Sequence, residues 1–145
     1  MKKRMAIISA LVVLFIASAL VVSCPQNVDD VTVADAATMT VTFTKGGAEA
    51  DETTLHFAIT GATIKDVSKV TVNKEATVTT NNVTVTPSGT GNTLDVKFAI
   101  GSTVETTDAG KYTINIPETA LTVDSTHKYP ATTITKVITV TVSAS

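Results

Sequence analysis

Apolar and polar residues alternate along much of this chain, and the alternation predicts short β-strands. Every second position is apolar in residues 38–44, and residues 54–60, 93–100 and 111–117 repeat the pattern. A period of two directs one side of each strand to a core and the other side to solvent. We therefore predict strands in these four segments, with the side chain of His56 on a solvent-facing side.

Three neighbouring segments in the middle of the chain carry less regular patterns. Residues 67–72 predict a further strand. Residues 77–86 predict one hairpin, or two short strands, around Asn81 and Asn82. Residues 87–92 contain a proline and two glycines and predict a turn.

The C-terminal part predicts a long connection followed by a last strand. We expect residues 118–133 to form an irregular crossover and residues 134–142 to form the strand. A slip in the apolar spacing of this strand predicts a bulge near Lys136 and Val137. Seven or eight short strands separated by turns predict an all-β domain, either a β-sandwich or a small barrel.

The first 23 residues have a different character from the rest of the chain. Lys2, Lys3 and Arg4 are followed by an apolar run from 6 to 22, which is the pattern of a secretory signal peptide. A retained transmembrane helix is the alternative, because the run is just long enough to cross a bilayer.

The residues Val21, Val22, Ser23 and Cys24, which end the apolar run, resemble the lipobox of bacterial lipoproteins. The resemblance implies that Cys24 receives a diacylglycerol and becomes the first residue after cleavage. A free or structural thiol is the alternative, but the single cysteine of the chain cannot form an internal disulfide. Two acyl chains give stable membrane anchoring.

The segment after Cys24 favours an outer-membrane location in a Gram-negative cell or a spirochaete. Pro25 stands where an aspartate would resemble an inner-membrane retention signal. We expect residues 24–30 to be a short tether and residues 31–145 to be one domain.

Composition after the signal segment supports a β-rich, mildly acidic domain. Removing 23 of the 145 residues leaves 122, and 29 of these are threonine, a β-branched residue that favours strands. Three of the 11 basic residues lie in the signal segment, so eight remain against 13 acidic ones, a net charge of −5. Such a surface argues against binding of nucleic acid.

Residues 108–114, Asp-Ala-Gly-Lys-Tyr-Thr-Ile, resemble the Asp-x-Gly-x-Tyr-x-Cys signature of immunoglobulin-like domains. The resemblance implies a tyrosine corner, in which Asp108 and Gly110 precede a strand and the hydroxyl of Tyr112 bonds to the backbone upstream. It implies an Ig-like antiparallel sandwich of about seven strands. Another kind of β-sandwich, with a simple turn here, is the alternative.

The chain departs from the Ig signature at its disulfide and its tryptophan. Ile114 occupies the position of the second cysteine, and Phe57 is our candidate for the position of the first. The chain contains no tryptophan for the third strand. The resemblance is therefore local and names no subfamily.

Residues that could carry out chemistry are sparse. The two histidines, His56 and His127, have no neighbouring ligands at zinc spacing. Glu49, Asp51 and Glu52 form an acidic cluster that suits calcium only weakly. The chain has no nucleophile, phosphate-binding or dinucleotide motif. We expect no catalytic residues, no metal and no cofactor.

These observations predict a lipid-anchored, non-enzymatic binding or structural module of the cell envelope. We expect its contacts at the end of the sandwich far from Cys24, or by addition of a strand to a sheet edge. The candidate binding loop contains His127, Lys128 and Tyr129. The partner would be a host-matrix protein, an envelope protein or a glycan. The alternative is a carbohydrate-binding or glycan-processing accessory lipoprotein.

Overall fold

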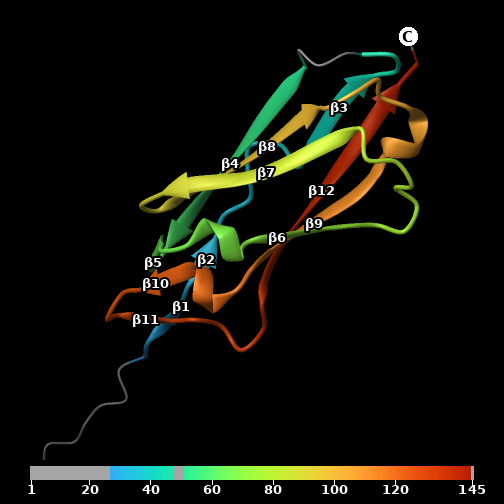
Figure 1. Ribbon diagram of the computed structural model, residues 1–145. Helices are drawn as coiled ribbons and strands as arrows, with labels where there is room; N and C mark the ends of the chain where they lie inside the picture. The colour runs from blue at the N-terminus through green and yellow to red at the C-terminus, as the bar shows by residue number, and fades with distance from the viewer. Residues whose placement is uncertain (1–26, 48–50, 145) are drawn as a thin grey trace, which may run out of the picture.

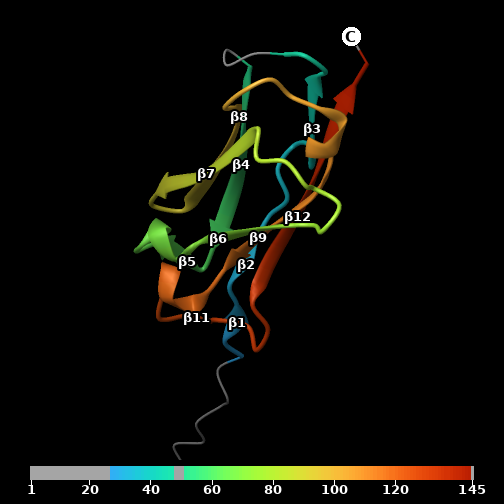
Figure 2. The ribbon, with the colours of Figure 1, turned by 45° about the vertical axis from the view of Figure 1, so that its right-hand side comes forward.

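Two four-stranded β-sheets pack face to face in this domain (Figures 1 and 2). The computed structural model describes residues 27–47 and 51–144, so the predicted signal segment and Cys24 lie outside the described residues. One sheet contains, in spatial order, β2 (Thr32–Val33), β4 (Glu52–Thr60), β8 (Thr93–Ile100) and β7 (Val83–Thr90). The other contains β3 (Thr40–Thr44), β12 (Ile134–Ser143), β9 (Gly110–Ile116) and β6 (Thr71–Lys74).

The strand order is that of an immunoglobulin-like sandwich. The first strand is split: β2 pairs antiparallel with β4, and the chain then crosses to the other sheet, where β3 pairs in parallel with β12. The two sheets correspond to the ABED and GFC sheets of the Ig fold, with β3 added beside the last strand. The predicted all-β, Ig-like sandwich is therefore confirmed.

Short elements close the end of the sandwich at which the described chain begins (Figure 1). There β1 (Asp29–Asp30) pairs in parallel with β11 (His127–Lys128), and β5 (Ala62–Ile64) pairs antiparallel with β10 (Leu121–Val123). Three 3-10 helices complete the described structure: η1 (Val67–Lys69), η2 (Thr106–Asp108) and η3 (Glu118–Ala120). Among the described residues, no helix has the length and apolarity needed to span a membrane.

The core lies between the sheets and follows the two-residue period. Leu55, Phe57 and Ile59 of β4 are buried, whereas the residues between them are exposed. Phe98 of β8 meets Tyr112 of β9 across the interior, with ring centroids 5.8 Å apart and planes at 77°. Each fully buried large apolar side chain contributes about 1.5–3 kcal/mol to folding, so this alternation is what holds the two sheets together.

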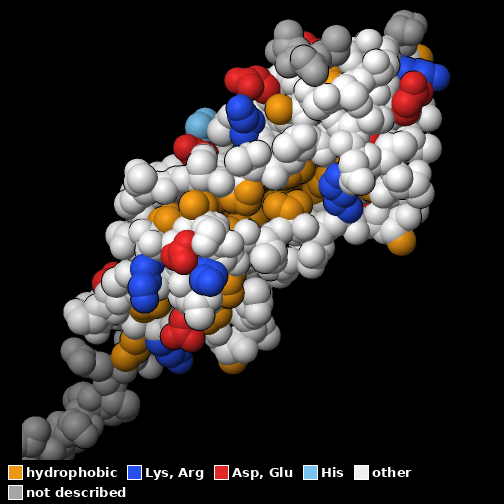
Figure 3. Space-filling view, viewed as in Figure 1, with side chains coloured by type: hydrophobic (Ala, Val, Ile, Leu, Met, Phe, Trp, Pro, Cys, Tyr) orange, Lys and Arg blue, Asp and Glu red, His pale blue; other side chains and the backbone are white. Residues whose placement is uncertain are grey.

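The side of the sandwich formed by β6 and β7 leaves part of the interior visible. Figure 3 shows a band of hydrophobic side chains between these two strands. Val72, Val85, Ile64 and Val67 are partly buried residues that pack against the core in this region.

The structure corrects the prediction for residues 77–92. Residues 77–82 form no strand, because this segment folds over η2 and is held there by side-chain hydrogen bonds. The predicted turn is shorter than expected, since β7 continues through Pro87 to Thr90 and only Gly91 and Asn92 connect it to β8. Gly91 has φ of +60°, a conformation that suits the first position of a two-residue hairpin turn.

Three other predicted segments need smaller corrections. In the segment 67–72, residues 67–69 form the 3-10 helix η1, and only Thr71 and Val72 belong to a strand. The tether ends earlier than expected, because Asp29 and Asp30 already form β1. The crossover 118–133 is not wholly irregular, since it contains η3, β10 and β11.

The predicted bulge in the last strand was wrong. The pairing of β12 with β9 runs without interruption from Ile134 to Val140. Lys136 occupies an inward-facing position of this register, where only 15% of its side chain is exposed, and its ammonium group lies 2.7 Å from the Asp35 carboxylate. Val137 points outward and is exposed. The apparent slip in the sequence therefore comes from a lysine on the inner face.

Candidate functional site

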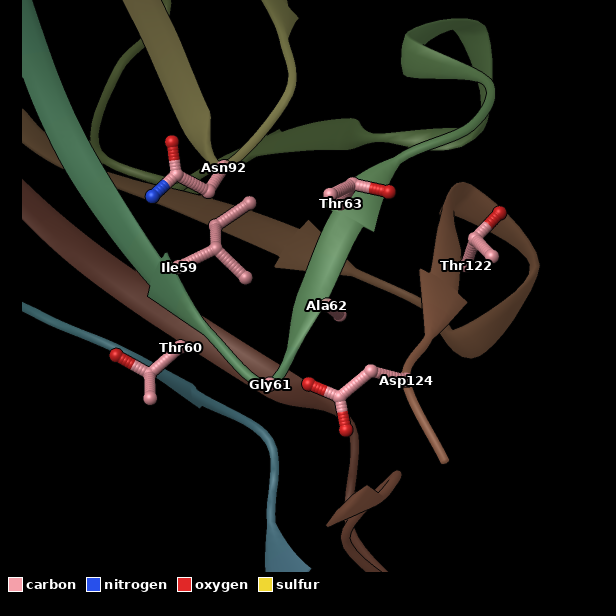
Figure 4. A pocket seen from close by; sticks show the side chains of 8 residues that line it. All are labelled: Ile59, Thr60, Gly61, Ala62, Thr63, Asn92, Thr122 and Asp124. Atoms are coloured by element: carbon pink, nitrogen blue, oxygen red, sulfur yellow. The ribbon is translucent and has the colours of Figure 1, made fainter. Parts of the chain in front are cut away.

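A pocket with a mixed polar and apolar lining lies at the end of the sandwich that carries β1 and β11. Three connections meet there: the turn from β4 to β5, the turn from β7 to β8, and the segment after β10. The pocket has a volume of about 450 Å³ and is lined by Ile59, Thr60, Gly61, Ala62, Thr63, Asn92, Thr122 and Asp124. Figure 4 shows Thr122 and Asp124 on one side of β5 and Asn92 and Ile59 on the other.

Gly61 makes the turn from β4 to β5 possible. Its φ of +84° is a conformation that L side chains rarely adopt, and a Cβ atom there would lie 2.3 Å from the ring of His127. The absence of a side chain therefore lets the imidazole pack against the backbone. The Asp124 amide donates to the carbonyl of Gly61 over 3.0 Å, which ties the two turns together.

Asp124 is the charged group of the pocket. Its Oδ1 atom accepts hydrogen bonds from the amide of Thr126 at 2.9 Å and the hydroxyl of Thr126 at 2.8 Å, and Nδ1 of His127 lies 2.8 Å away. The contacts with His127 and Thr126 lower the pKa of Asp124 to about 2. The group is thus ionised near neutral pH, and no described residue hydrogen-bonds its Oδ2 atom.

The turn that carries Asn92 is fixed to the neighbouring strands through its backbone. The carbonyl of Asn92 accepts from the amide of Ile59 at 2.8 Å, and the carbonyl of Gly91 accepts from the amide of Ile64 at 2.7 Å. The Asn92 side chain remains exposed. The pocket thus presents an amide, a carboxylate and several hydroxyls above an apolar base, which suits a small polar ligand rich in hydroxyl groups.

A second aspartate, Asp108, accepts several hydrogen bonds at the opposite end of the sandwich. Asp108 is fully buried and is the only buried charged residue in the described part of the chain. Its Oδ2 atom accepts from the Glu105 amide at 2.9 Å and the Asn82 side chain at 3.0 Å. Its Oδ1 atom accepts from the Thr80 hydroxyl and, at 3.2 Å, from the Asn82 amide. Burial alone would raise the pKa of Asp108, but these hydrogen bonds together hold it below its ordinary value.

The tyrosine corner residues lie together at this same end. The buried hydroxyl of Tyr112 donates to the backbone carbonyl of Asp108 over 3.0 Å, which is the contact that the Ig resemblance implies. Burial, followed by the nearby charge of Asp108, raises the pKa of Tyr112 to about 12. Gly110 has φ of +151°, and a Cβ atom there would lie 2.5 Å from Val78. These residues anchor the connection between β6 and β7.

The structure does not bring the three predicted binding-loop residues to one surface. His127 packs against Gly61 with 19% of its side chain exposed. Lys128 points to solvent, and its ammonium group lies 3.7 Å from Asp30. Tyr129 is partly buried; its hydroxyl donates to the carbonyl of Ile116 and accepts from the Ile134 amide at 3.0 Å. Tyr129 therefore ties the start of β12 to the end of β9 through its hydroxyl.

The other residues considered from the sequence are also placed. His56 is exposed, as predicted, and pairs with Asp95 on the adjacent strand at 2.7 Å. Glu49 lies outside the described residues, whereas Asp51 and Glu52 are exposed. Within residues 27–47 and 51–144, no three potential metal ligands come together.

Sequence reasoning missed the residues that define both ends. Asp124 and Asn92 line the pocket, and Thr80 and Asn82 bind Asp108. One local signal could have indicated Asp124. Its carboxylate accepts a hydrogen bond from the amide of Thr126, two residues ahead, which is a recognisable turn motif. Nothing local could have identified Asn82, because its partner is 26 positions away.

No protein-family model matches the chain, and no curated protein sequence matches it.

Proposed function

We propose that this chain is an exported bacterial lipoprotein, anchored through lipid on Cys24, whose Ig-like domain is a non-enzymatic binding or structural module of the cell envelope. The observation that carries this proposal is how soon the domain follows the lipobox. The first strand, β1, begins at Asp29, five positions after Cys24. Five residues span at most about 17 Å, so the domain stays close to the outer membrane that we propose as its location.

The short tether gives the domain an orientation. The elements next to the anchor are β1 and β11, so the pocket and the loop of His127 and Lys128 would face the membrane. This changes the expectation that the crossover 118–133 lies far from Cys24, because β11 within it pairs with β1. The connections 75–82 and 101–109, at the opposite end, would face outward to a host-matrix or envelope protein.

A structural or binding role is supported by how the titratable groups are used. The Tyr112 hydroxyl bonds to the Asp108 backbone inside the domain, and Asp66 and Asp124 bond to residues two positions ahead. In each case the shifted pKa arises from burial or from contacts that shape a loop or a strand end. Of these three groups, only Asp124 lines the pocket, where its Oδ2 atom can accept a hydrogen bond from a bound ligand.

Fatty-acid labelling tests the proposal. Cells producing the chain are grown with radiolabelled palmitate, and a Cys24→Ser variant serves as the matched control. We expect label on the chain that retains Cys24 and none on the Cys24→Ser variant. Mass spectrometry of the purified protein should show an N-terminus that starts at acylated Cys24. An unlabelled chain that still begins with Met1 would disprove the anchoring.

A second candidate function, glycan binding, is favoured by the pocket lining. Asn92, Thr63, Thr122 and Asp124 offer the hydrogen-bonding groups that sugar hydroxyls require. A glycan array followed by titration calorimetry would test it. We expect Asp124→Asn and Asn92→Ala to abolish any binding. Asp66→Asn is the matched control, because Asp66 makes the same kind of local hydrogen bonds outside the pocket. Absence of binding to every glycan would reject this candidate.

A further inference from the structure

The part of β4 that lies beyond β2 has an open edge. Residues of β4 alternate in the direction of their backbone groups: the amide of Ile59 donates to Asn92 on the β8 side, whereas the carbonyl of Ala58 accepts from Ala34 on the opposite side. By this alternation the amides and carbonyls of Glu52, Thr54 and His56 point away from β8. The neighbouring β2 pairs only with Ile59 and Thr60, and no described residue hydrogen-bonds these three backbone positions.

Three other edge strands carry features that discourage pairing over part or all of their length. Pro87 of β7 stands where the backbone nitrogen points away from β8, so the edge lacks a donor there. On β3, the Thr38 side chain occupies both the amide and the carbonyl of Thr40, each at 3.2 Å. The edge strand β6 has only four residues. The stretch 52–56 of β4 has neither a proline nor a side-chain cap of this kind.

Space for another strand exists beside this edge. A depression of about 340 Å³ lies between the β3 residues 42–44 and residues 51–53. A second, of about 170 Å³, lies between residues 36–38 and residues 54–56. Together they follow the open edge along its whole length. Charged side chains of both signs gather over β4, at the upper left of Figure 3.

We propose that a second copy of this chain pairs with the open edge, β4 antiparallel to β4, in a two-fold register centred on Thr54. In this register Thr54 stands opposite Thr54 of the second copy, and Glu52 stands opposite His56 of the second copy. Every outward-pointing amide and carbonyl of the three residues then finds a partner, because antiparallel pairs exchange both bonds at such positions. The interface is isologous: the same three residues of each copy form it, and both copies contribute equally.

The side chains on this edge select the same register. Glu52 lies 3.3 Å from Lys97 and His56 lies 2.7 Å from Asp95, so the exposed face already alternates in charge. In the proposed dimer each histidine stands between Asp95 of its own chain and Glu52 of the other. Shifting the centre to Glu52 would place two glutamates opposite each other, and like charges at such positions are unfavourable. Shifting it to His56 would remove the pairing of Glu52 with His56. A second copy is therefore a better fit than an unrelated strand.

The antiparallel arrangement sets the two domains in opposite directions. The ends that carry β1 and β11 would lie at opposite ends of the pair, on either side of the two-fold axis. Copies that stand upright on facing membranes would bridge the two membranes, whereas two copies on one membrane would pair in this way only by leaving the upright orientation. This consequence rests on the proposed lipid anchor, but the pairing itself does not.

Cysteine cross-linking of the full chain, purified in mild detergent so that no membrane constrains it, tests the register. Thr54→Cys should give a covalent dimer with a short thiol cross-linker, because opposite Cα atoms in such a pair are about 5.5 Å apart. Thr86→Cys, an exposed threonine on β7, is the matched control and should stay monomeric. The chain without an introduced cysteine shows how much cross-linking comes from Cys24 itself.

A second pair of variants tests the register independently. Glu52→Cys and His56→Cys should each cross-link poorly alone, since like positions are about 14 Å apart along the strands. A mixture of the two, carrying different tags, should cross-link to one another. The proposal is overturned if Thr54→Cys forms no more dimer than Thr86→Cys, or if the mixed pair reacts no better than either variant alone.

Discussion

Asp108 and Asp124 lie at opposite ends of the sandwich, and each accepts hydrogen bonds from loop residues near it. Asp108 is fully buried, and both of its carboxylate oxygens are used by donors from two different connections. Asp124 has 51% of its side chain exposed, and its contacts all fall on one oxygen and come from Thr126 and His127. The buried group joins distant parts of the chain, whereas the exposed one shapes a single turn.

The difference teaches where stability and binding reside in this domain. A buried donor left without its acceptor costs about 1–3 kcal/mol. Loss of any hydrogen bond to Asp108 is therefore expected to lower the free energy of unfolding. Solvent can replace the contacts of Asp124, and its second oxygen remains accessible to a ligand. The Asp108 end is therefore expected to be the rigid end, and the Asp124 end to be the one that tolerates change.

The largest expected effect is that of Asp108→Ala. The substitution removes the shared acceptor of Thr80, Asn82 and Glu105 and leaves their part-buried donors without this partner. We expect the free energy of unfolding to fall by about 3 kcal/mol or more, measured by urea denaturation. Asp124→Ala is the control and should cost much less. Equal losses from the two variants would contradict the comparison.

Gly61→Ala should have the next largest effect. A methyl group would collide with the His127 ring, and the positive φ would be strained, so we expect a loss of about 2 kcal/mol. Gly46→Ala is a matched control, because Gly46 has φ of +78° but a Cβ atom there would have no neighbouring atom within 4 Å. Thermal unfolding of both variants isolates the contact with His127. The idea fails if the two variants lose the same stability.

Tyr112→Phe should cost about 1 kcal/mol by removing the hydrogen bond to the carbonyl of Asp108. It should also alter the alkaline limb of the stability curve. The pKa of Tyr112 is raised from 10 to about 12 in the folded state, so its contribution is present below pH 10 and is lost as pH rises through 12. The free energy of unfolding, measured between pH 9 and 12, should therefore fall less steeply in the phenylalanine variant. Parallel curves would rule out this assignment.

The smallest effect concerns acid. The pKa of Asp108 is lowered from 3.8 in the folded state, so its contribution is present above that pH and is lost as pH falls through the lower folded value. We expect Asp108→Asn to flatten the loss of stability below pH 3.8. Asp124→Asn should flatten it as well, because the pKa of Asp124 is lowered to about 2. Denaturation series at several acidic pH values measure both slopes. An acid limb that Asp108→Asn leaves unchanged would contradict this assignment.

The strands that could be predicted share one property, which is that local alternation alone defines them. The segment 93–100 has its predicted bounds, and residues 54–60 and 111–117 lie within a residue or two of β4 and β9. Their inward residues are buried in the observed structure. The resemblance at 108–114 also indicated the sandwich, because Asp108, Gly110 and Tyr112 act within a few residues of one another.

The sequence predictions that were wrong share one physical cause, which is contact between positions far apart in the chain. Pro87 can lie in a strand because its nitrogen faces an open edge, which the sequence does not show. Residues 77–82 stay out of the sheets because Asp108, far along the chain, binds them. Lys136 occupies an inner-face position because Asp35 lies beside it, 101 positions earlier.

By itself the sequence determined the strand-forming segments, the face of each that is buried, and the lipobox pattern before the domain, because these depend on residues close together in the chain. Only the tertiary structure decided that β2 and β3 lie in different sheets, that Asp124 and Asn92 share a pocket, and that β4 keeps an open edge. These features depend on which strands become neighbours. That choice is made by burial of the core as a whole, and short-range periodicity carries no record of it.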